Sequence, residues 1–319
     1  MTIAKIKGFT WNIAIFALFT ILAFWRSTQL PNFGSSQVKT IIIGVLAIAL
    51  LAMGQSIIII GGGINLAIGA EAVLINCLTA KYMNGASFSK SILIAFGAIA
   101  LGIMIGSLTG FIISKSGIAD IVVTLATSFI LVGLAMYVLP QPGGGANASF
   151  AQLISGRGNS FLAPLLAFLI PFLFIWIPIY RSRPGIAIYA VGSNRDAAFL
   201  SGVNVQNTRI FSYALGGFFA GFSGMVLTCI TLGASPFANI SSAATLNSVA
   251  ASVLGGVALS GGVGGLFGPA IAALVIYFIP TIMLGYGIDS AYSQILQGAL
   301  TILVVLLGEV LRRRAGRVK

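Results

Sequence analysis

The sequence contains little charge and no histidine. Only 7% of its 319 residues are charged, whereas a soluble domain carries about 25% charged residues because its surface faces water. Hydrophobic residues make up 58% of the chain, and its mean hydropathy is +1.07. Most side chains must therefore face hydrocarbon or other buried helices, and these proportions exclude a water-soluble globular fold.

The residues that common enzyme sites need are also scarce. Without histidine the chain lacks the usual general base, the Ser–His and Cys–His nucleophile pairs and most zinc sites. Cys77 and Cys229 lie in apolar runs without CxxC spacing, so we interpret them as small buried hydrophobic residues. No lysine follows a glycine, which excludes a P-loop for ATP. We expect no catalytic residue, no metal site and no cofactor bound by the chain itself.

Long apolar runs are what the sequence has in abundance. A helix that spans a bilayer needs roughly 20 apolar residues, and the runs do not alternate as barrel strands do. The expected helices are 11–30, 40–60, 64–83, 91–113, 117–139, 161–180, 210–232, 246–259, 264–284 and 291–311. We expect the first to be a retained span and not a cleaved signal. The sequence predicts an all-α polytopic membrane protein of about ten helices, some short or re-entrant, in a single transmembrane domain over residues 1–319.

The distribution of basic residues predicts the orientation. If the N-terminus is cytoplasmic and every segment crosses, five of the 17 basic residues lie outside: Arg26, Lys39, Lys81, Lys90 and Arg157. The other twelve lie inside, as the positive-inside rule favours. Both termini are then cytoplasmic, and the basic tail 312–319 lies beside anionic lipid. Basic residues do not alternate with aromatic ones on a solvated face, which disfavours nucleic-acid binding.

The longest polar stretch on the predicted inner side runs from 181 to 209. Pro184 and Gly185 break any continuation of the preceding helix. We therefore expect a cytoplasmic loop over 181–209, which is either an ordinary connection or the carrier of a docking element.

Within this loop, residues 195–201 carry the signals of a short helix. Ser193 or Asn194 caps its start, and Asp196 falls in its first turn, where the helix dipole favours an acidic side chain. Gly202 closes it as a C-terminal cap. We expect a short, capped helix that lies on the cytoplasmic surface.

Glycine clusters interrupt the apolar runs once in each half. One is Gly61–Gly63, and the other extends over 255–268. Glycine costs roughly 1 kcal/mol in a helix relative to alanine, so such clusters indicate broken or re-entrant helices or very close helix contacts. One interruption in each of two related halves is typical of internally repeated transporters, whose broken segments point toward the translocation site. The alternative is tight packing of small residues, which we expect for the pairs Gly102–Gly106 and Gly217–Gly221.

Polar residues within the spans add to the predicted pathway. Glu71 lies about two turns past the triple glycine, where it either faces a wet cavity or is protonated. Asn65 either binds a polyhydroxy solute or caps helix 64–83, and both roles are compatible. The predicted substrate pathway consists of Gly62, Gly63, Asn65, Glu71 and Ser260. An ion-coupled secondary transporter that uses Glu71 as a proton or cation carrier is the alternative.

Three phrases in order resemble a known family. Residues 62–69 read GGINLAIG, similar to the family signature GGIDLSVGS. Residues 189–205, YAVGSN followed by AAFLSGVNV, are similar to YAIGGNxxAARLSGINV, and 253–264 match VLGGxxLxGGxG. Over roughly 40–310 the chain resembles the membrane permease subunits of ribose-type sugar ABC importers, in the branched-chain amino acid/ribose permease superfamily.

The resemblance implies the partners of the chain. The chain would lie in the bacterial inner membrane beside a second permease subunit, which is the same or a homologous chain. Two cytoplasmic ATPase subunits would bind ATP and attach to the pair from the cytoplasm. A periplasmic or lipid-anchored binding protein would deliver the sugar. The resemblance also implies that one segment is a coupling helix seated on the ATPase. Its residues are Asn194, Asp196, Ala197, Ala198, Leu200, Ser201 and Gly202.

The chain also departs from the family pattern. Asn65 replaces the aspartate of GGIDLS, and Asp196 replaces a common glutamate. No acidic residue occurs in 246–249, where the family has one. These losses leave the solute open, or indicate one half of a heterodimer. Gly268–Pro269 resembles the related branched-chain amino acid permeases, so amino acids, like nucleosides, stay alternatives to a sugar.

Overall fold

A computed structural model describes residues 2–28, 34–156 and 160–288, together with residues 292, 295, 296, 298, 299 and 302. The described residues form helices and loops without a β-strand, which confirms the predicted all-α fold. Among the described residues, six helical segments are long and apolar enough to span a membrane. They are α2 (Ser35–Ile60), α4 (Phe88–Ser116), α5 (Asp120–Val138), the combined segment Leu162–Tyr180, α11 (Val205–Thr231) and α13 (Phe267–Gly285). The predicted span 291–311 and the tail 312–319 lie outside the described residues, apart from single positions.

The remaining helices precede these segments or lie between them in the sequence. They are α1 (Thr2–Thr28), α3 (Ile68–Met83), α6 (Ala148–Ser155), α9 (Arg183–Ser193), α10 (Arg195–Leu200) and α12 (Ala238–Leu254). The segment Leu162–Tyr180 consists of α7 (Leu162–Pro171), a π-helical turn η2 (Phe172–Trp176) and α8 (Ile177–Tyr180). The π turn directly follows Pro171, whose missing N–H interrupts the regular hydrogen-bond pattern.

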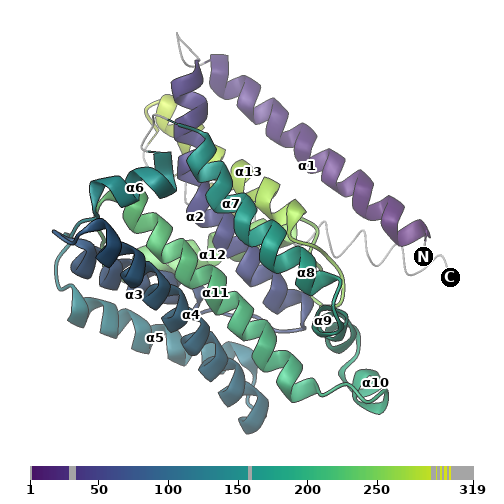
Figure 1. Cartoon of the computed structure of the whole chain (residues 1–319). Coiled ribbons are helices and arrows are strands. Elements are labelled where there is room, and N and C mark those ends of the chain that lie inside the picture. The colour runs from purple at the N-terminus through teal and green to yellow at the C-terminus, as the bar shows by residue number, and fades with distance from the viewer. Residues whose placement is uncertain are drawn as a thin grey trace.

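Helix α11 is the central element of the bundle. It packs against α4, α2 and α3, and Figure 1 shows it between α2 on one side and the α3–α4–α5 layer on the other. The second half of α2 is buried on every side from Val45 to Ile60, except for the half-buried Ile48, because nearly all of its side chains are apolar. Helices α12 and α13 cover α2 from the opposite direction, and α1 packs on α13.

Small residues allow α4 and α11 to approach closely. A Cβ atom on Gly102 would overlap the carbonyl oxygen of Gly217 and lie 2.9 Å from the Cα of Gly221. Gly106 meets the same helix one turn further along. The predicted packing role of these glycines is confirmed, and it fixes the distance between the central helix and its largest neighbour.

Helix α12 begins earlier and ends earlier than the predicted helix 246–259. Its buried residues include four hydroxyl side chains: Ser241, Thr245, Ser248 and Ser252. Each donates to a carbonyl three or four residues back in the same helix, so burial leaves none unsatisfied. Ser252 also pairs with Ser56 of α2 at 3.0 Å. Hydropathy treats these residues as polar and therefore places the start of the helix too late.

Two further helices fall where the sequence predicts loops. Pro184 does interrupt the preceding helix, but it then occupies the first turn of α9, where a missing N–H costs nothing. Asn147 caps α6 by accepting from the amide of Phe150 at 3.1 Å, and Gly156 ends it in the left-handed conformation. Both helices carried local signals, since cap residues flank each of them.

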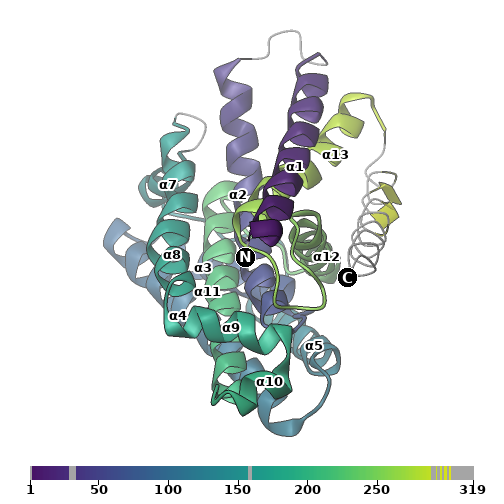
Figure 2. The same ribbon diagram turned by 90° about the vertical axis from the view of Figure 1, so that its right-hand side faces the viewer.

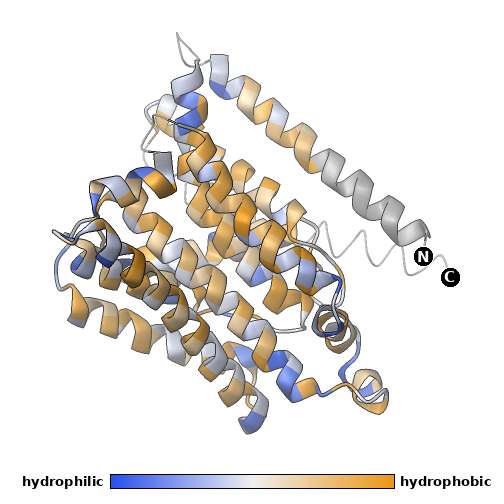
Figure 3. Ribbon diagram, viewed as in Figure 1, coloured by the Kyte–Doolittle hydropathy of each residue, from blue (hydrophilic) through white to orange (hydrophobic). Residues whose placement is uncertain are grey.

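The loops gather at two ends of the bundle. The end that carries α10, here called the α10 end, contains 61–67, 117–119, 183–204 and 255–266. Hydrogen bonds join 183–204 to 61–67 and to 255–266. The other end, here called the α6 end, contains 84–87, 139–147 and 232–237, joined in the same way. Figure 2 shows α9 and α10 together at the α10 end, and Figure 3 shows hydrophilic residues gathered at both ends and apolar ones between them.

The α4–α11 contact leads to a stability prediction. We expect Gly102→Ala to lower the free energy of unfolding by about 1–3 kcal/mol, because its methyl group overpacks a backbone contact. Gly97→Ala in the same helix adds a methyl group with nothing within 4 Å, and should raise stability by up to about 1 kcal/mol. Thermal unfolding in detergent measures both. Equal shifts for the two variants would contradict the close approach.

Candidate functional site

The two glycine-rich loops meet at the α10 end. The first loop follows α2 and covers 61–67, and the second follows α12 and covers 255–266. The amide of Gly262 in the second loop donates to the carbonyl of Ile60, at the end of α2, at 2.8 Å. Gly261 also packs against Gly62, since a Cβ on Gly261 would lie 3.0 Å from the Cα of Gly62. Interruptions that lie about 200 residues apart in sequence therefore form one structure.

Gly192, near the end of α9, lies against both loops. A Cβ on Gly192 would overlap the carbonyl oxygen of Ile60 and lie 2.7 Å from the amide nitrogen of Gly262. Only a residue without a side chain allows the three backbones to touch here. The segment that was predicted as a cytoplasmic loop is thus in direct backbone contact with both glycine clusters.

Helix α10 has the capped form that the sequence predicts. The Asn194 side chain accepts from the amide of Ala197 at 2.9 Å, and Gly202 adopts φ +81° after the last turn. Its side chains split into two sets. Ala198 is buried, whereas Phe199 is 70% and Leu200 84% exposed. Asp196, Ser201 and Gly202 are also exposed.

The predicted coupling residues differ in exposure, and their coupling role stays a prediction. Ala198 packs inside the segment, so a bulky replacement there would disturb folding before it reached any partner. Phe199 was missing from the predicted set, although it lies in the matched phrase AAFLSGVNV. Phe199 and Leu200 form an exposed apolar pair at the α10 end.

A nearly buried ion pair between α5 and α11 lies against the first loop. Asp120, the first residue of α5, pairs with Arg209 in the first turns of α11. The hydroxyl of Tyr213 donates to Oδ2 of Asp120 at 2.9 Å and lies 3.3 Å from the carbonyl oxygen of Ile64. A Cβ on Gly63 would lie 2.8 Å from Oδ2 of Asp120. Sequence reasoning missed this pair, because 89 residues separate Asp120 from Arg209.

The predicted pathway residues fall in different places. Gly62, Gly63 and Asn65 lie in the first loop, and Ser260 is exposed in the second, beside Gly261. The side chain of Asn65 accepts from the amide of Ala67 at 2.8 Å, within the loop. Ala67 is itself the N-cap residue, so Asn65 does not cap the helix, and its role toward a solute stays a prediction. That helix begins at Ile68, four residues later than predicted, because 61–67 form turns and extended backbone.

Glu71 does not join the residues of the two loops. It is 1% exposed, and its Oε1 would lie 3.0 Å from a Cβ on Gly217 of α11. This oxygen has no hydrogen-bond partner among the described residues. Glu71 therefore lies in the contact between α3 and α11, and its role in a pathway stays a prediction.

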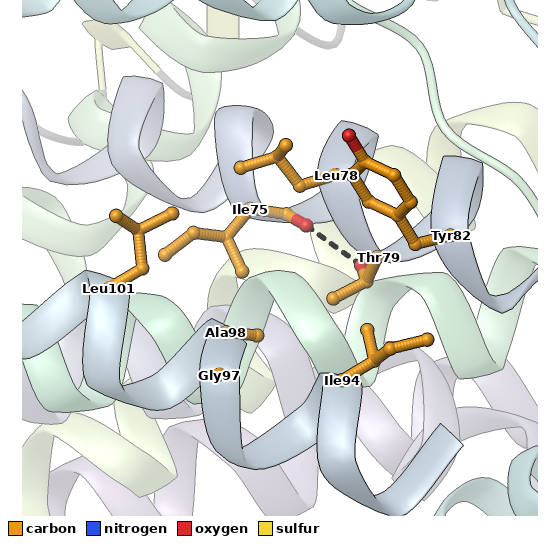
Figure 4. Close-up of a pocket in the computed structure, with 8 residues that line it drawn as sticks. All are labelled: Ile75, Leu78, Thr79, Tyr82, Ile94, Gly97, Ala98 and Leu101. Atoms are coloured by element: carbon orange, nitrogen blue, oxygen red, sulfur yellow. Dashed lines mark hydrogen bonds between the residues drawn. The ribbon is translucent and has the colours of Figure 1, made fainter. Parts of the chain in front are cut away.

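Two hollows lie elsewhere. One, of about 240 Å³, lies between α3 and α4; Figure 4 shows it lined by apolar side chains, with the Thr79 hydroxyl bonded to the Ile75 carbonyl at 2.8 Å. The other, of about 370 Å³, lies at the α6 end and includes Asn76, Gly143 and Thr231. The first has an apolar lining that suits lipid chains better than a polar solute.

These observations define a class of protein: a helical membrane subunit whose interrupted spans meet under a short, capped surface helix. The chain belongs to the family described as branched-chain amino acid transport system / permease component, whose model matches residues 37–305. This confirms the resemblance found in the sequence.

Curated relatives cover most of the chain. The ribose import permease protein RbsC of Escherichia coli K12 is 31% identical over 301 residues, which are 92% of this chain and 91% of the relative. The D-allose transport system permease protein AlsC of the same strain is 27% identical over 265 residues, 83% and 80% of the two chains. The autoinducer 2 import system permease protein LsrD of Photorhabdus temperata is 27% identical over 317 residues, 96% and 92%. No solved structure matches the chain.

The ion pair leads to the second prediction. We expect Asp120→Asn to lower the free energy of unfolding by about 3–5 kcal/mol, because Arg209 would stay nearly buried without a counter-charge. Asp196→Asn removes the same charge from an exposed site on α10 and should leave stability nearly unchanged. Thermal unfolding of both variants in detergent measures the difference, and an unchanged Asp120→Asn protein would show that the pair does not support the bundle.

Proposed function

We propose that the chain is the membrane permease subunit of an ABC importer that moves a sugar across the bacterial inner membrane. Separate cytoplasmic ATPase subunits would bind ATP, and a periplasmic or lipid-anchored binding protein would deliver the solute. The observation that carries the proposal is the arrangement at the α10 end. Exposed Phe199 and Leu200 lie there on a capped helix beside both glycine-rich loops. This arrangement gives an external motor one surface from which to reach both interruptions.

The names of the relatives support a solute class. They state ribose import, D-allose transport and autoinducer 2 import, and the matches cover 83–96% of the chain. We propose a polyhydroxylated solute of sugar size, with ribose as the first candidate. The family description includes branched-chain amino acids, so these, with nucleosides, form the comparison set in uptake experiments.

We infer the orientation from the charges at the two ends. Basic residues at the α10 end include Lys115, Arg181, Arg183, Arg195 and Arg209. Those at the opposite end include Arg26, Lys39, Lys81 and Lys90. This excess supports a cytoplasmic α10 end and cytoplasmic termini. A second permease subunit, identical or homologous, would complete the translocation pathway, with lipid around the remaining surface.

Uptake by a reconstituted system tests the proposal. We expect liposomes that contain the chain, its ATPase and its binding protein to accumulate labelled ribose or a related sugar only when ATP is present on the α10 side. Leucine and a nucleoside serve as competing solutes. Accumulation by the chain alone under a proton or sodium gradient would contradict the proposal and favour the ion-coupled alternative with Glu71.

Assembly with the ATPase tests the docking surface. We expect Leu200→Ser to reduce co-purification of the ATPase at least tenfold, which corresponds to the loss of about 1.4 kcal/mol. Leu153→Ser is the matched control, because Leu153 is 57% exposed on α6 at the opposite end of the bundle. Quantitative pull-down in mild detergent measures both. Equal recovery for the two variants would mean that α10 is not the docking helix.

A further inference from the structure

We propose that Tyr189 and Arg195 are positioning residues that tie the movement of α10 to both glycine-rich loops. Each of the two side chains binds one loop through a backbone carbonyl. The inference rests on the proposed function and adds to it the pair of contacts through which α10 would act.

Tyr189 binds the second loop. It lies on α9, and its hydroxyl donates to the carbonyl of Gly264 at 2.8 Å. Its ring packs edge-on against Tyr180, with centroids 5.8 Å apart, so α8 holds the side chain in place. Gly264 adopts φ +137°, a conformation open to glycine, and the loop closes on itself through the Ala258 amide and the Val263 carbonyl at 3.1 Å. Tyr189 thus binds the second loop at Gly264, which lies just outside the turn closed by Ala258 and Val263.

Arg195 binds the first loop. It is the first residue of α10, and its Nη2 donates to the carbonyl of Gly62 at 2.7 Å. The carbonyl is free to accept because the chain leaves the helix here, with Gly62 at φ +78°. Arg195 is exposed, so its side chain bridges from the surface helix to the interrupted end of α2. The guanidinium binds a neutral backbone carbonyl, which is consistent with a side chain that positions the backbone.

The two contacts lie on either side of Gly192. Tyr189 precedes this residue by three positions and Arg195 follows it by three, and Gly192 itself touches Ile60 and Gly262 by backbone. Residues 189–195 therefore reach both loops at three successive points, and all three contacts end on backbone atoms of the loops. Because Tyr189 lies on α9, a displacement of α9 and α10 together must either carry both loops along or break these hydrogen bonds.

Hydrogen exchange in the isolated chain tests the contacts themselves. We expect Arg195→Met to speed exchange of the Gly63 amide, and Tyr189→Phe to speed exchange of the Ala258 and Gly261 amides. Each effect should be about fivefold, as the loss of one net hydrogen bond implies, and the loop on the other side should change less. Arg183→Met and Tyr137→Phe are matched controls, because Arg183 lies on α9 and Tyr137 is 84% exposed on α5. Neither side chain hydrogen-bonds a glycine-rich loop among the described residues.

Transport in the full complex tests the coupling. We expect Tyr189→Phe and Arg195→Met to assemble with the ATPase and hydrolyse ATP within twofold of wild type, yet to lower sugar imported per ATP at least about fivefold. The two controls should keep the wild-type ratio. Tyr189→Phe removes a single oxygen atom, so the test does not depend on the folding of the arginine variant.

The outcomes separate the inference from the proposed function. Unchanged exchange in both loops, or altered exchange with a wild-type ratio of sugar to ATP, would overturn the inference. A wild-type complex that neither assembles nor imports contradicts the proposed function, and it does so before any variant is compared. The exchange measurement needs no partner and decides the contacts in either case.

Discussion

Backbone groups that leave a helix where the protein buries them have no water to bind, so each needs a partner within the protein. The interrupted ends of α2 and α12 meet this requirement through one another and through α9 and α10. Ile60 accepts from Gly262, Gly62 from Arg195, and Gly264 from Tyr189. The hydrogen bonds that satisfy the two interrupted helix ends therefore also bring both glycine-rich loops next to α9 and α10. This constraint explains why these segments gather at the α10 end.

Glycine has two separate roles in this arrangement. At Gly102 and Gly192 the absence of a side chain lets backbones touch, whereas at Gly62 it permits a left-handed turn. The sequence leaves pathway and packing as alternatives for the glycine clusters. The structure shows packing between backbones at the clusters, and the same contacts place them where a moving α10 would act. Packing and the proposed mechanism thus depend on the same glycine backbone atoms. For this reason composition could not distinguish a packing role from a pathway role.

Features with local signals were predictable from the sequence. Apolar runs indicated most of the spans, and Asn194 with Gly202 indicated α10 to within one residue. The start of α12 was not predictable from hydropathy, because buried hydroxyls such as Thr245 bond to their own helix and still count as polar. The Asp120–Arg209 pair was out of reach for another reason, since nothing local links residues that only the fold brings together.

The two loops differ in what holds them to the rest of the bundle. The first loop lies between Arg195 of α10 and the group formed by Asp120, Arg209 and Tyr213 on α5 and α11. The second loop has the Tyr189 contact, its own internal turn and close backbone packing, where Gly262 meets Ser193 and Gly255 meets Pro269. Because the Gly262–Ile60 hydrogen bond joins the loops, a movement of α10 would act on both together. In the proposed importer, relative motion of the two halves would then require that the contacts at the two loops yield unequally.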